Sequence, residues 1–190
     1  ADLRRTKDGV WVVFHDRTLR RTTGHPGWLA RSRWDEIRSL SAGGWFSPRF
    51  RDERIPKVAE FLALCRRKKV NLFLDVKVPG GEKQLIDEIR RRGDAHRVAL
   101  GVGSPSAAEA WRPLLGSSFL YWVTGSRIPL TSRRIGLAKR LGFKGFISFK
   151  RWVTSQVVRE VHEAGLTLYV WTIRTAAEQK MFLSLGVDGI

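Results

Sequence analysis

One short segment at the start of the sequence could bring a carboxylate and an imidazole together. Residues 1–24 are predicted to form a strand, an Asp8-Gly9 turn and a second strand that ends in His15-Asp16. Asp-Gly between two extended runs is a strong signal for a two-residue hairpin. A turn centred on these two residues places Asp2 opposite His15, with their Cβ atoms about 5 Å apart. A carboxylate and an imidazole at that distance can hold a metal ion and move a proton.

A second carboxylate closes another strand pattern. Residues 70–76 form an apolar run that ends in Asp75 and is followed by Lys77. Residues two apart in a strand point to the same side. At the mouth of a barrel, Asp75 could bind a divalent cation and Lys77 a phosphate oxygen. A surface salt bridge at the strand end is the alternative.

Aromatic residues at one strand end and in the loop-rich insertion have two interpretations each. Trp171 ends the strand pattern of residues 166–172 and could form the apolar wall of a pocket or fill a barrel interior. Trp45 and Phe46 could cover the mouth of a barrel or form a small core of their own, and we expect the small core. The one cysteine, Cys65, falls on the apolar face of a predicted helix, which indicates a buried thiol without a disulfide.

After the hairpin, short apolar strands alternate with helices, which predicts parallel strands joined by helical crossovers. Predicted strands cover residues 70–76, 98–102, 119–123, 145–149, 166–172 and 188–190, and predicted helices cover 57–68, 82–92, 106–115, 132–141, 154–164 and 175–185. We expect one α/β domain over residues 1–190 with a loop-rich insertion at about 25–56. This order suits an incomplete TIM (β/α)8 barrel, with its first strand and helix and the end of its eighth unit missing. An open doubly wound sheet is the alternative, which the lack of a GxGxxG motif disfavours.

The charge of the chain suggests an anionic partner. The 190 residues are 43% hydrophobic and carry a net charge of +17, with an isoelectric point near 11.2. A phosphate ester, a nucleic acid or a membrane surface would match that charge. The alternative is a proteome that is rich in arginine, and the spread of basic residues along the whole chain favours it. No segment is long and apolar enough to span a bilayer, and no signal peptide precedes the first strand. We leave the compartment and oligomeric state open, with the cytoplasm favoured.

Several separate motifs give the chain an end-to-end resemblance to the glycerophosphodiester phosphodiesterase family. The most specific is the hairpin segment itself, Asp2–Gly9 followed by Val12–Asp16 and Leu19–Gly24. The others follow in the expected order: Gly44-Trp45-Phe46, Glu53-Arg54-Ile55-Pro56, Asp75-Val76-Lys77, Val170-Trp171-Thr172 and Gly186-Val187-Asp188-Gly189-Ile190.

The resemblance implies a TIM barrel, a divalent metal ion (Mg²⁺ or Ca²⁺) and hydrolysis of glycerophosphodiesters to an alcohol and glycerol 3-phosphate, a reaction of lipid metabolism. It also implies roles for individual residues. Asp2 and Asp75 would be metal ligands, His15 a catalytic histidine, Lys77 a phosphate-contacting lysine and Trp171 a pocket aromatic.

Some features of the family pattern are missing. The first catalytic histidine, from a His-Arg-Gly strand, and the Glu two residues before Asp2 are absent, and Asp75 stands where the family usually has Glu. We therefore expect a fragment truncated at both ends that lacks competent catalysis as written, and a longer parent protein that is the active enzyme. Two alternatives stay open: a degenerate, non-catalytic barrel, and a basic module that binds nucleic acid or membranes. The enzyme itself would need a small-molecule substrate and no nucleic acid.

Overall fold

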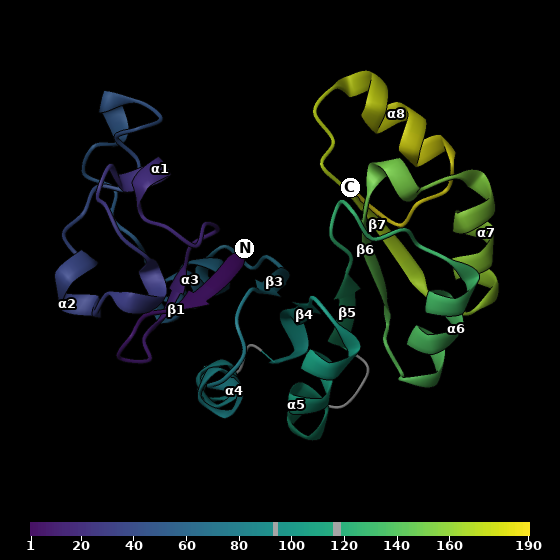
Figure 1. Cartoon of the computed structure of the whole chain (residues 1–190), viewed down its shortest axis with the longest axis horizontal. Helices are drawn as coiled ribbons and strands as arrows, with labels where there is room; N and C mark the ends of the chain where they lie inside the picture. Colours follow the sequence, from purple (N-terminus) through teal and green to yellow (C-terminus); the bar gives the residue numbers. More distant parts are fainter. Residues whose placement is uncertain (93–94, 116–118) are drawn as a thin grey trace. The chain divides into compact units, whose positions relative to one another are not determined.

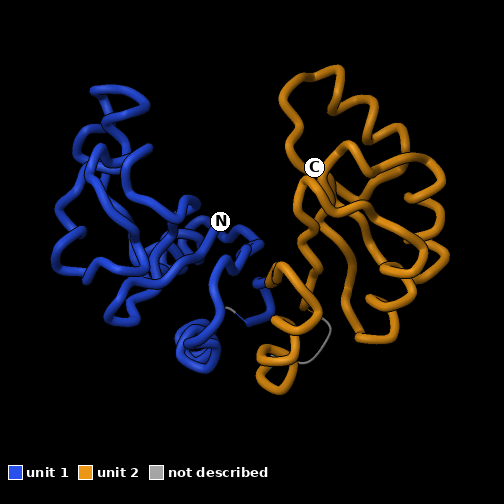
Figure 2. Tube along the Cα trace, viewed as in Figure 1, with its two compact units in different colours: residues 1–98 blue, residues 99–190 orange. Residues whose placement is uncertain are grey.

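A computed structural model describes residues 1–92, 95–115 and 119–190. The chain divides into two compact units, Ala1–Val98 and Ala99–Ile190 (Figure 2). In each unit, parallel strands are followed by helices, which is the alternation that the sequence predicts. None of the helices in the described ranges has the length and apolarity needed to cross a membrane.

The sheet of the first unit contains one antiparallel and one parallel strand pair. β1 (Asp2–Arg5) pairs antiparallel with β2 (Trp11–Val13) and parallel with β3 (Leu72–Val76). The parallel register places Asp2 beside Asp75. The strand that precedes the hairpin turn and the strand 70 residues later therefore bring two carboxylates to neighbouring positions.

The hairpin register differs by one residue from the predicted one. Leu3 pairs with Val13 and Arg5 with Trp11, so Asp2 lies opposite Phe14, whose N–H donates to Asp2 O at 2.9 Å. The predicted direct pairing of Asp2 with His15 is therefore wrong. Thr6 and Val10 form the last hydrogen-bonded pair, so the turn between them has three residues, 7–9, rather than two, and Asp8-Gly9 occupies its last two positions.

Backbone and side-chain bonds explain the longer loop. The N–H of Thr6 donates to Val10 O at 3.0 Å, and Gly9, at φ +85°, donates back to Thr6 O at 3.0 Å. The Asp8 carboxylate accepts from the Thr6 hydroxyl at 2.6 Å and from the N–H of Trp34 at 3.0 Å. Asp8 thus joins the turn to the first turn of a helix in the insertion, a long-range contact that the hairpin pattern does not contain.

The insertion is loop-rich, as predicted, but its core is made of other residues than expected. The short elements here are α1 (Arg20–Thr23), just before the insertion, and η1 (Leu29–Arg31), α2 (Trp34–Ile37) and η2 (Pro48–Phe50) within it. Only the helix at α2 was predicted. These elements enclose a cluster of buried side chains: Val12, Phe14, Leu19, Leu29, Ile37 and Ile55. Trp45 and Phe46 are 53% and 71% exposed, so the small core expected around them is wrong.

Two amphipathic helices complete the first unit. α3 (Val58–Arg67) buries Val58, Leu62 and Cys65, which confirms the buried position predicted for the thiol. α4 (Glu82–Arg91) buries Leu85, Ile86 and Ile89. A short η3 (Ala95–Arg97) leads to the next strand. Apolar residues spaced three and four apart give each helix one face for the core.

The second unit repeats the strand–helix alternation. Its strands β4 (Val98–Val102), β5 (Leu120–Val123), β6 (Gly145–Phe149) and β7 (Thr167–Trp171) pair parallel in that order. The helices are α5 (Pro105–Leu115), α6 (Ser132–Arg140), α7 (Ser155–Glu163) and α8 (Ala176–Ser184), with η5 (Lys150–Trp152) after β6. In Figure 1, α6 and α7 lie along one side of β6 and β7, and α7 packs on β7.

Threonine caps fix where three of these helices begin. The hydroxyls of Thr131, Thr154 and Thr175 each accept a hydrogen bond from the backbone N–H three residues further on. Such caps satisfy amide groups that have no partner within the helix. After α8 the chain returns beside β7, where Val170 N–H donates to Gly189 O at 3.0 Å, as expected for the start of a further parallel strand.

Candidate active site

Two carboxylates and a lysine form a cluster on one face of the first unit's sheet. Parallel pairing of β1 with β3 sets Asp2 beside Asp75, and Lys77 follows two residues later on the same side. Lys77 Nζ lies 3.0 Å from Asp2 Oδ1 and forms an ion pair with the Asp75 carboxylate. The three side chains that the sequence singled out from two distant segments are therefore in direct contact.

The charge balance of this acid–lysine cluster is unequal. The side chain of Asp75 is 17% exposed, and its burial raises the pKa of the carboxyl despite the neighbouring Lys77. Burial acts to lower the pKa of Lys77, but hydrogen bonds to Asp75 and Asp2 outweigh it and raise that pKa. Two carboxylates facing one ammonium group carry an excess negative charge, which favours a further cation or a proton.

His15 lies in a pocket that also includes Asp2. This pocket, with a volume of about 300 Å³, is lined by Ala1, Asp2, Val13, Phe14, His15, Asp16, Arg21, Thr22, Ala42 and Trp45. Asp2 lies opposite Phe14 rather than His15 in the hairpin. His15 directly follows Phe14, so its imidazole still reaches the pocket that Asp2 lines. Asp2 and His15 therefore share a pocket although the predicted register was wrong, and their functional roles stay a prediction.

A hydrogen-bonded chain orients the imidazole. His15 Nδ1 lies 2.7 Å from Asp16 Oδ1, and Arg21 Nε donates to Asp16 Oδ2 at 2.5 Å. The hydrogen bond from Arg21 lowers the pKa of the Asp16 carboxyl, which therefore remains an acceptor at neutral pH. A proton on Nδ1 donated to Asp16 leaves Nε2 to exchange a proton with a bound molecule.

Arg21 and Trp45 belong to the pocket but were not identified as site residues from the sequence. The Arg21 guanidinium lies over the Trp45 ring, 5.0 Å from its centroid. Trp45 therefore lines the pocket wall, in keeping with the alternative that placed it at the mouth. The motif Gly44-Trp45-Phe46 was the available signal, because a tryptophan side chain in a loop can offer its large aromatic face to a pocket.

Trp171 lies at the carboxyl end of β7 in the second unit. It pairs in register with Phe149 of β6, and the two ring centroids are 5.1 Å apart. Its indole Nε1 is buried and has no hydrogen-bond partner within the described residues. Its role as a pocket aromatic stays a prediction.

Metal binding at this site would rely on carboxylate oxygens. Over residues 1–92, 95–115 and 119–190, no group of three or more His, Cys, Asp or Glu side chains is arranged to hold a metal ion. The acid–lysine cluster offers two carboxylates, whose oxygens are the ligands that Mg²⁺ and Ca²⁺ prefer. Its donor chemistry and excess negative charge fit a hard divalent cation.

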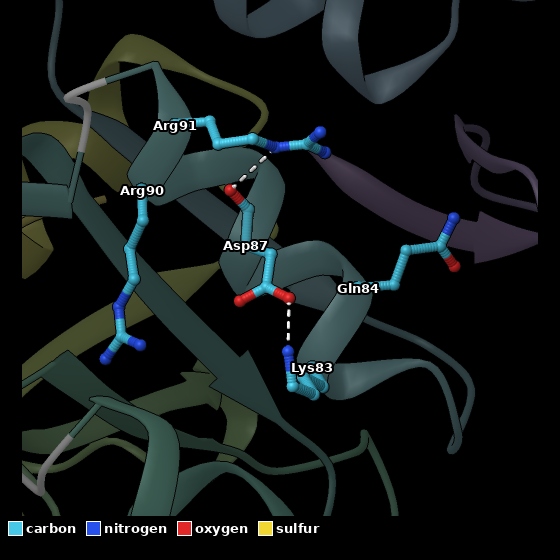
Figure 3. Close-up of a pocket in the computed structure, with 5 residues that line it drawn as sticks. All are labelled: Lys83, Gln84, Asp87, Arg90 and Arg91. Atoms are coloured by element: carbon cyan, nitrogen blue, oxygen red, sulfur yellow. Dashed lines mark hydrogen bonds and ion pairs between the residues drawn. The ribbon is translucent and has the colours of Figure 1, made fainter.

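A larger hollow of about 560 Å³ runs along the outer face of α4 and contains none of the predicted site residues (Figure 3). Its lining comes from one helix: Lys83, Gln84, Asp87, Arg90 and Arg91. Lys83 Nζ pairs with Asp87 at 2.6 Å, and Arg91 Nε donates to the Asp87 carbonyl at 3.3 Å. These are ordinary contacts of a solvated helix face.

Comparisons with known proteins place the geometry in a family. The chain is 28% identical over 197 residues to a glycerophosphodiester phosphodiesterase of Caldanaerobacter subterraneus, covering 100% of this chain and 79% of that protein. It is 25% identical over 210 residues to a glycerophosphodiester phosphodiesterase of Bacillus subtilis, covering 100% and 71%.

Solved structures share the fold. A phosphodiesterase of Oleispira antarctica in complex with the product sn-glycerol-3-phosphate matches with a TM-score of 0.88 at 21% identity, covering 100% of this chain and 78% of that one. A glycerophosphodiester phosphodiesterase of Agrobacterium tumefaciens matches with a TM-score of 0.82 at 22% identity, covering 100% and 80%. With the strand–helix alternation of both units, these matches confirm the predicted fold, an incomplete (β/α)8 barrel.

A family model matches residues 1–120 and 84–190, which together span the whole chain. The hairpin, the acid–lysine cluster and the barrel strands all lie inside these matches. The chain belongs to the glycerophosphoryl diester phosphodiesterase family.

Proposed function

We propose that this protein hydrolyses glycerophosphodiesters to an alcohol and glycerol 3-phosphate, with the help of a divalent metal ion. The observation that carries the proposal is the acid–lysine cluster beside the pocket of His15, at the carboxyl ends of barrel strands where such folds place their chemistry. Family membership and relatives with this activity support the same reaction.

Each residue has a role that its surroundings suit. Asp2 and Asp75 would hold the metal ion, which when bound supplies positive charge to the non-bridging phosphate oxygens. Lys77 would donate to one of these oxygens, because its raised pKa keeps the ammonium charged. His15, oriented by Asp16, would protonate the departing alkoxide or remove a proton from the attacking oxygen.

The test measures release of choline and glycerol 3-phosphate from glycerophosphocholine by the protein made from its complete coding sequence. Excess EDTA should abolish turnover, and added Mg²⁺ or Ca²⁺ should restore it. His15→Ala should lower kcat by about 10²- to 10⁴-fold, the usual range for a general acid or base.

His162→Ala is the matched control, because His162 pairs with Asp188 in the second unit and has no proposed role. Its activity should stay within about twofold of the wild type. Turnover that survives both EDTA and His15→Ala would overturn the proposed mechanism.

A further inference from the structure

A second cavity adjoins the acid–lysine cluster and is lined mainly by positive charge. Its volume is about 240 Å³, and its lining residues are Arg4, Arg5, Arg17, Trp28, Leu29, Ala30, Lys77 and Val78. Lys77 belongs both to this arginine cavity and to the acid–lysine cluster. The arginine cavity is thus next to the proposed reaction site without being part of it.

The strand register explains this arrangement. Asp2 pairs with Asp75 and Leu3 with Val76, so the next position, Arg4, falls beside Lys77. Arg4 also lies two residues beyond Asp2 and hence on the same side of β1. Its Nε donates to the carbonyl of His15 at 2.8 Å. The arginine cavity therefore lies beyond the acid–lysine cluster along β1 and β3, toward the carboxyl ends of these strands.

The arginines of this cavity are not held in ion pairs within the part of the chain that the structure describes. Within residues 1–92, 95–115 and 119–190, Arg4, Arg5 and Arg17 form no ion pair with a carboxylate, whereas Arg21 nearby pairs with Asp16. Gathering three guanidinium groups around one small cavity costs free energy that a bound anion would offset.

We propose that the arginine cavity binds a second phosphate group, carried by the alcohol portion of the glycerophosphodiester. Planar guanidinium groups donate paired hydrogen bonds that match phosphate oxygens. A substrate spanning both sites would place its diester at the acid–lysine cluster and its second phosphate among the arginines. The inference rests on the proposed function and adds a substrate class to it: diesters whose alcohol is itself phosphorylated.

The test compares two substrates that differ by one phosphate, glycerophosphoinositol and glycerophosphoinositol 4-phosphate. For the wild type, kcat/KM should be at least about tenfold higher with the phosphorylated substrate, given the strength of charged hydrogen bonds. Arg17→Gln should abolish this preference and leave the unphosphorylated substrate unaffected. Arg17 suits the experiment because it is exposed and is not part of the catalytic groups.

Arg20→Gln is the matched control, because Arg20 is an exposed arginine of α1 that lines neither cavity. It should keep the wild-type preference. Equal kcat/KM for both substrates in the wild type, or an equal loss for both in Arg17→Gln, would overturn the proposal.

Calorimetric titration separates this result from a failure of the proposed function. If neither compound is hydrolysed, tighter wild-type binding of the phosphorylated compound that Arg17→Gln removes still supports the arginine cavity, and equal binding overturns it. Inorganic phosphate is the third ligand. If the wild type binds inorganic phosphate as tightly as the phosphorylated diester and Arg17→Gln loses this binding, the proposal that the phosphate belongs to the substrate is overturned. That result would indicate a site for free phosphate.

Discussion

Each unit contains a lysine paired with a carboxylate, and the two pairs differ in charge balance. In the first unit, Lys77 lies between Asp2 and Asp75. In the second unit, Lys150 pairs with Glu178 alone. Burial raises the pKa of Asp75, whereas the hydrogen bond from Lys150 lowers the pKa of Glu178.

The surroundings of Glu178 explain the difference. One of its oxygens pairs with Lys150, and the other accepts from the N–H of Arg174 at 2.8 Å, while its own N–H donates to Thr175 Oγ1 at 3.1 Å. Glu178 is thus a balanced charge that helps to begin α8. Asp75 shares its lysine with another acid. The comparison teaches that excess charge, rather than the presence of a lysine–acid pair, distinguishes the candidate site from the scaffold.

The largest expected effect concerns activity. Asp75→Asn should lower kcat on glycerophosphocholine by about 10²- to 10³-fold. It removes one of the two carboxylates proposed to hold the metal ion that stabilises the phosphate oxygens in the transition state. Glu178→Gln makes the equivalent change in the second unit and should leave kcat within about twofold. Similar losses in both variants would remove the distinction between the two pairs.

The next effect concerns how the second unit is stabilised. A Cβ atom on Gly145 would lie 2.1 Å from the carbonyl oxygen of Thr167, across the β6–β7 pair. Gly145→Ala should lower the free energy of unfolding by about 3 kcal/mol, as overpacking does at a rigid site. Urea unfolding followed by circular dichroism measures the change.

Gly103→Ala is the control, since nothing lies within 4 Å of the Cβ it would add. It should change the free energy of unfolding by less than about 1 kcal/mol. A Gly145→Ala protein as stable as the control would mean that β6 and β7 are less closely packed than the structure has them.

A smaller effect is expected from the residue that orients His15. Asp16→Asn removes the charged acceptor of Nδ1 and should lower kcat by about 10- to 100-fold, with little change in KM. Asp87→Asn, on the exposed face of α4, is the control and should behave as the wild type. An unaltered kcat in Asp16→Asn would show that His15 needs no orienting carboxylate.

The smallest effect is a pH dependence of stability that has opposite signs in the two units. The pKa of Glu178 is lowered on folding, so its contribution is present above the ordinary carboxyl pKa and is lost as pH falls through the lowered one. The pKa of Asp75 is raised, so the folded state loses stability as pH rises from the ordinary carboxyl pKa through the raised one.

Thermal unfolding in EDTA between about pH 3 and pH 7 measures both effects. Glu178→Gln should lower the Tm at pH 7, with the difference from the wild type disappearing toward pH 3. Asp75→Asn should not lower the Tm at pH 7. A loss of stability at neutral pH in both variants would indicate that Asp75 is a structural ion pair like Glu178.

Local patterns predicted most elements well. β4 and β6 have the predicted bounds, and α6 and α7 lie within a residue of theirs. Apolar periodicity and threonine caps act over a few residues, so the chain's local sequence carries them. The four-residue helix α1 has no buried side chain and no apolar stripe, which is why no pattern indicated it.

The hairpin shows where local reasoning reached its limit. Asp8-Gly9 indicates a turn, but it does not fix the loop length, and Asp8 also accepts a hydrogen bond from the N–H of Trp34, 26 residues away. One residue of loop length changes which side chain lies opposite Asp2. The prediction that Asp2 and His15 lie close together did not depend on the exact register, because His15 follows the end of β2 in either case.

The amino-acid sequence by itself determined the family, the order of strands and helices, and the identity of Asp2, His15, Asp75 and Lys77 as candidate residues. Residue type and short-range spacing suffice for these. Only the tertiary structure decided that Lys77 lies between two carboxylates, that Asp16 and Arg21 orient His15, and that three arginines, without an ion pair among the described residues, gather beside them. Such contacts join segments far apart in the chain, and their energies depend on burial and charge that no local pattern records.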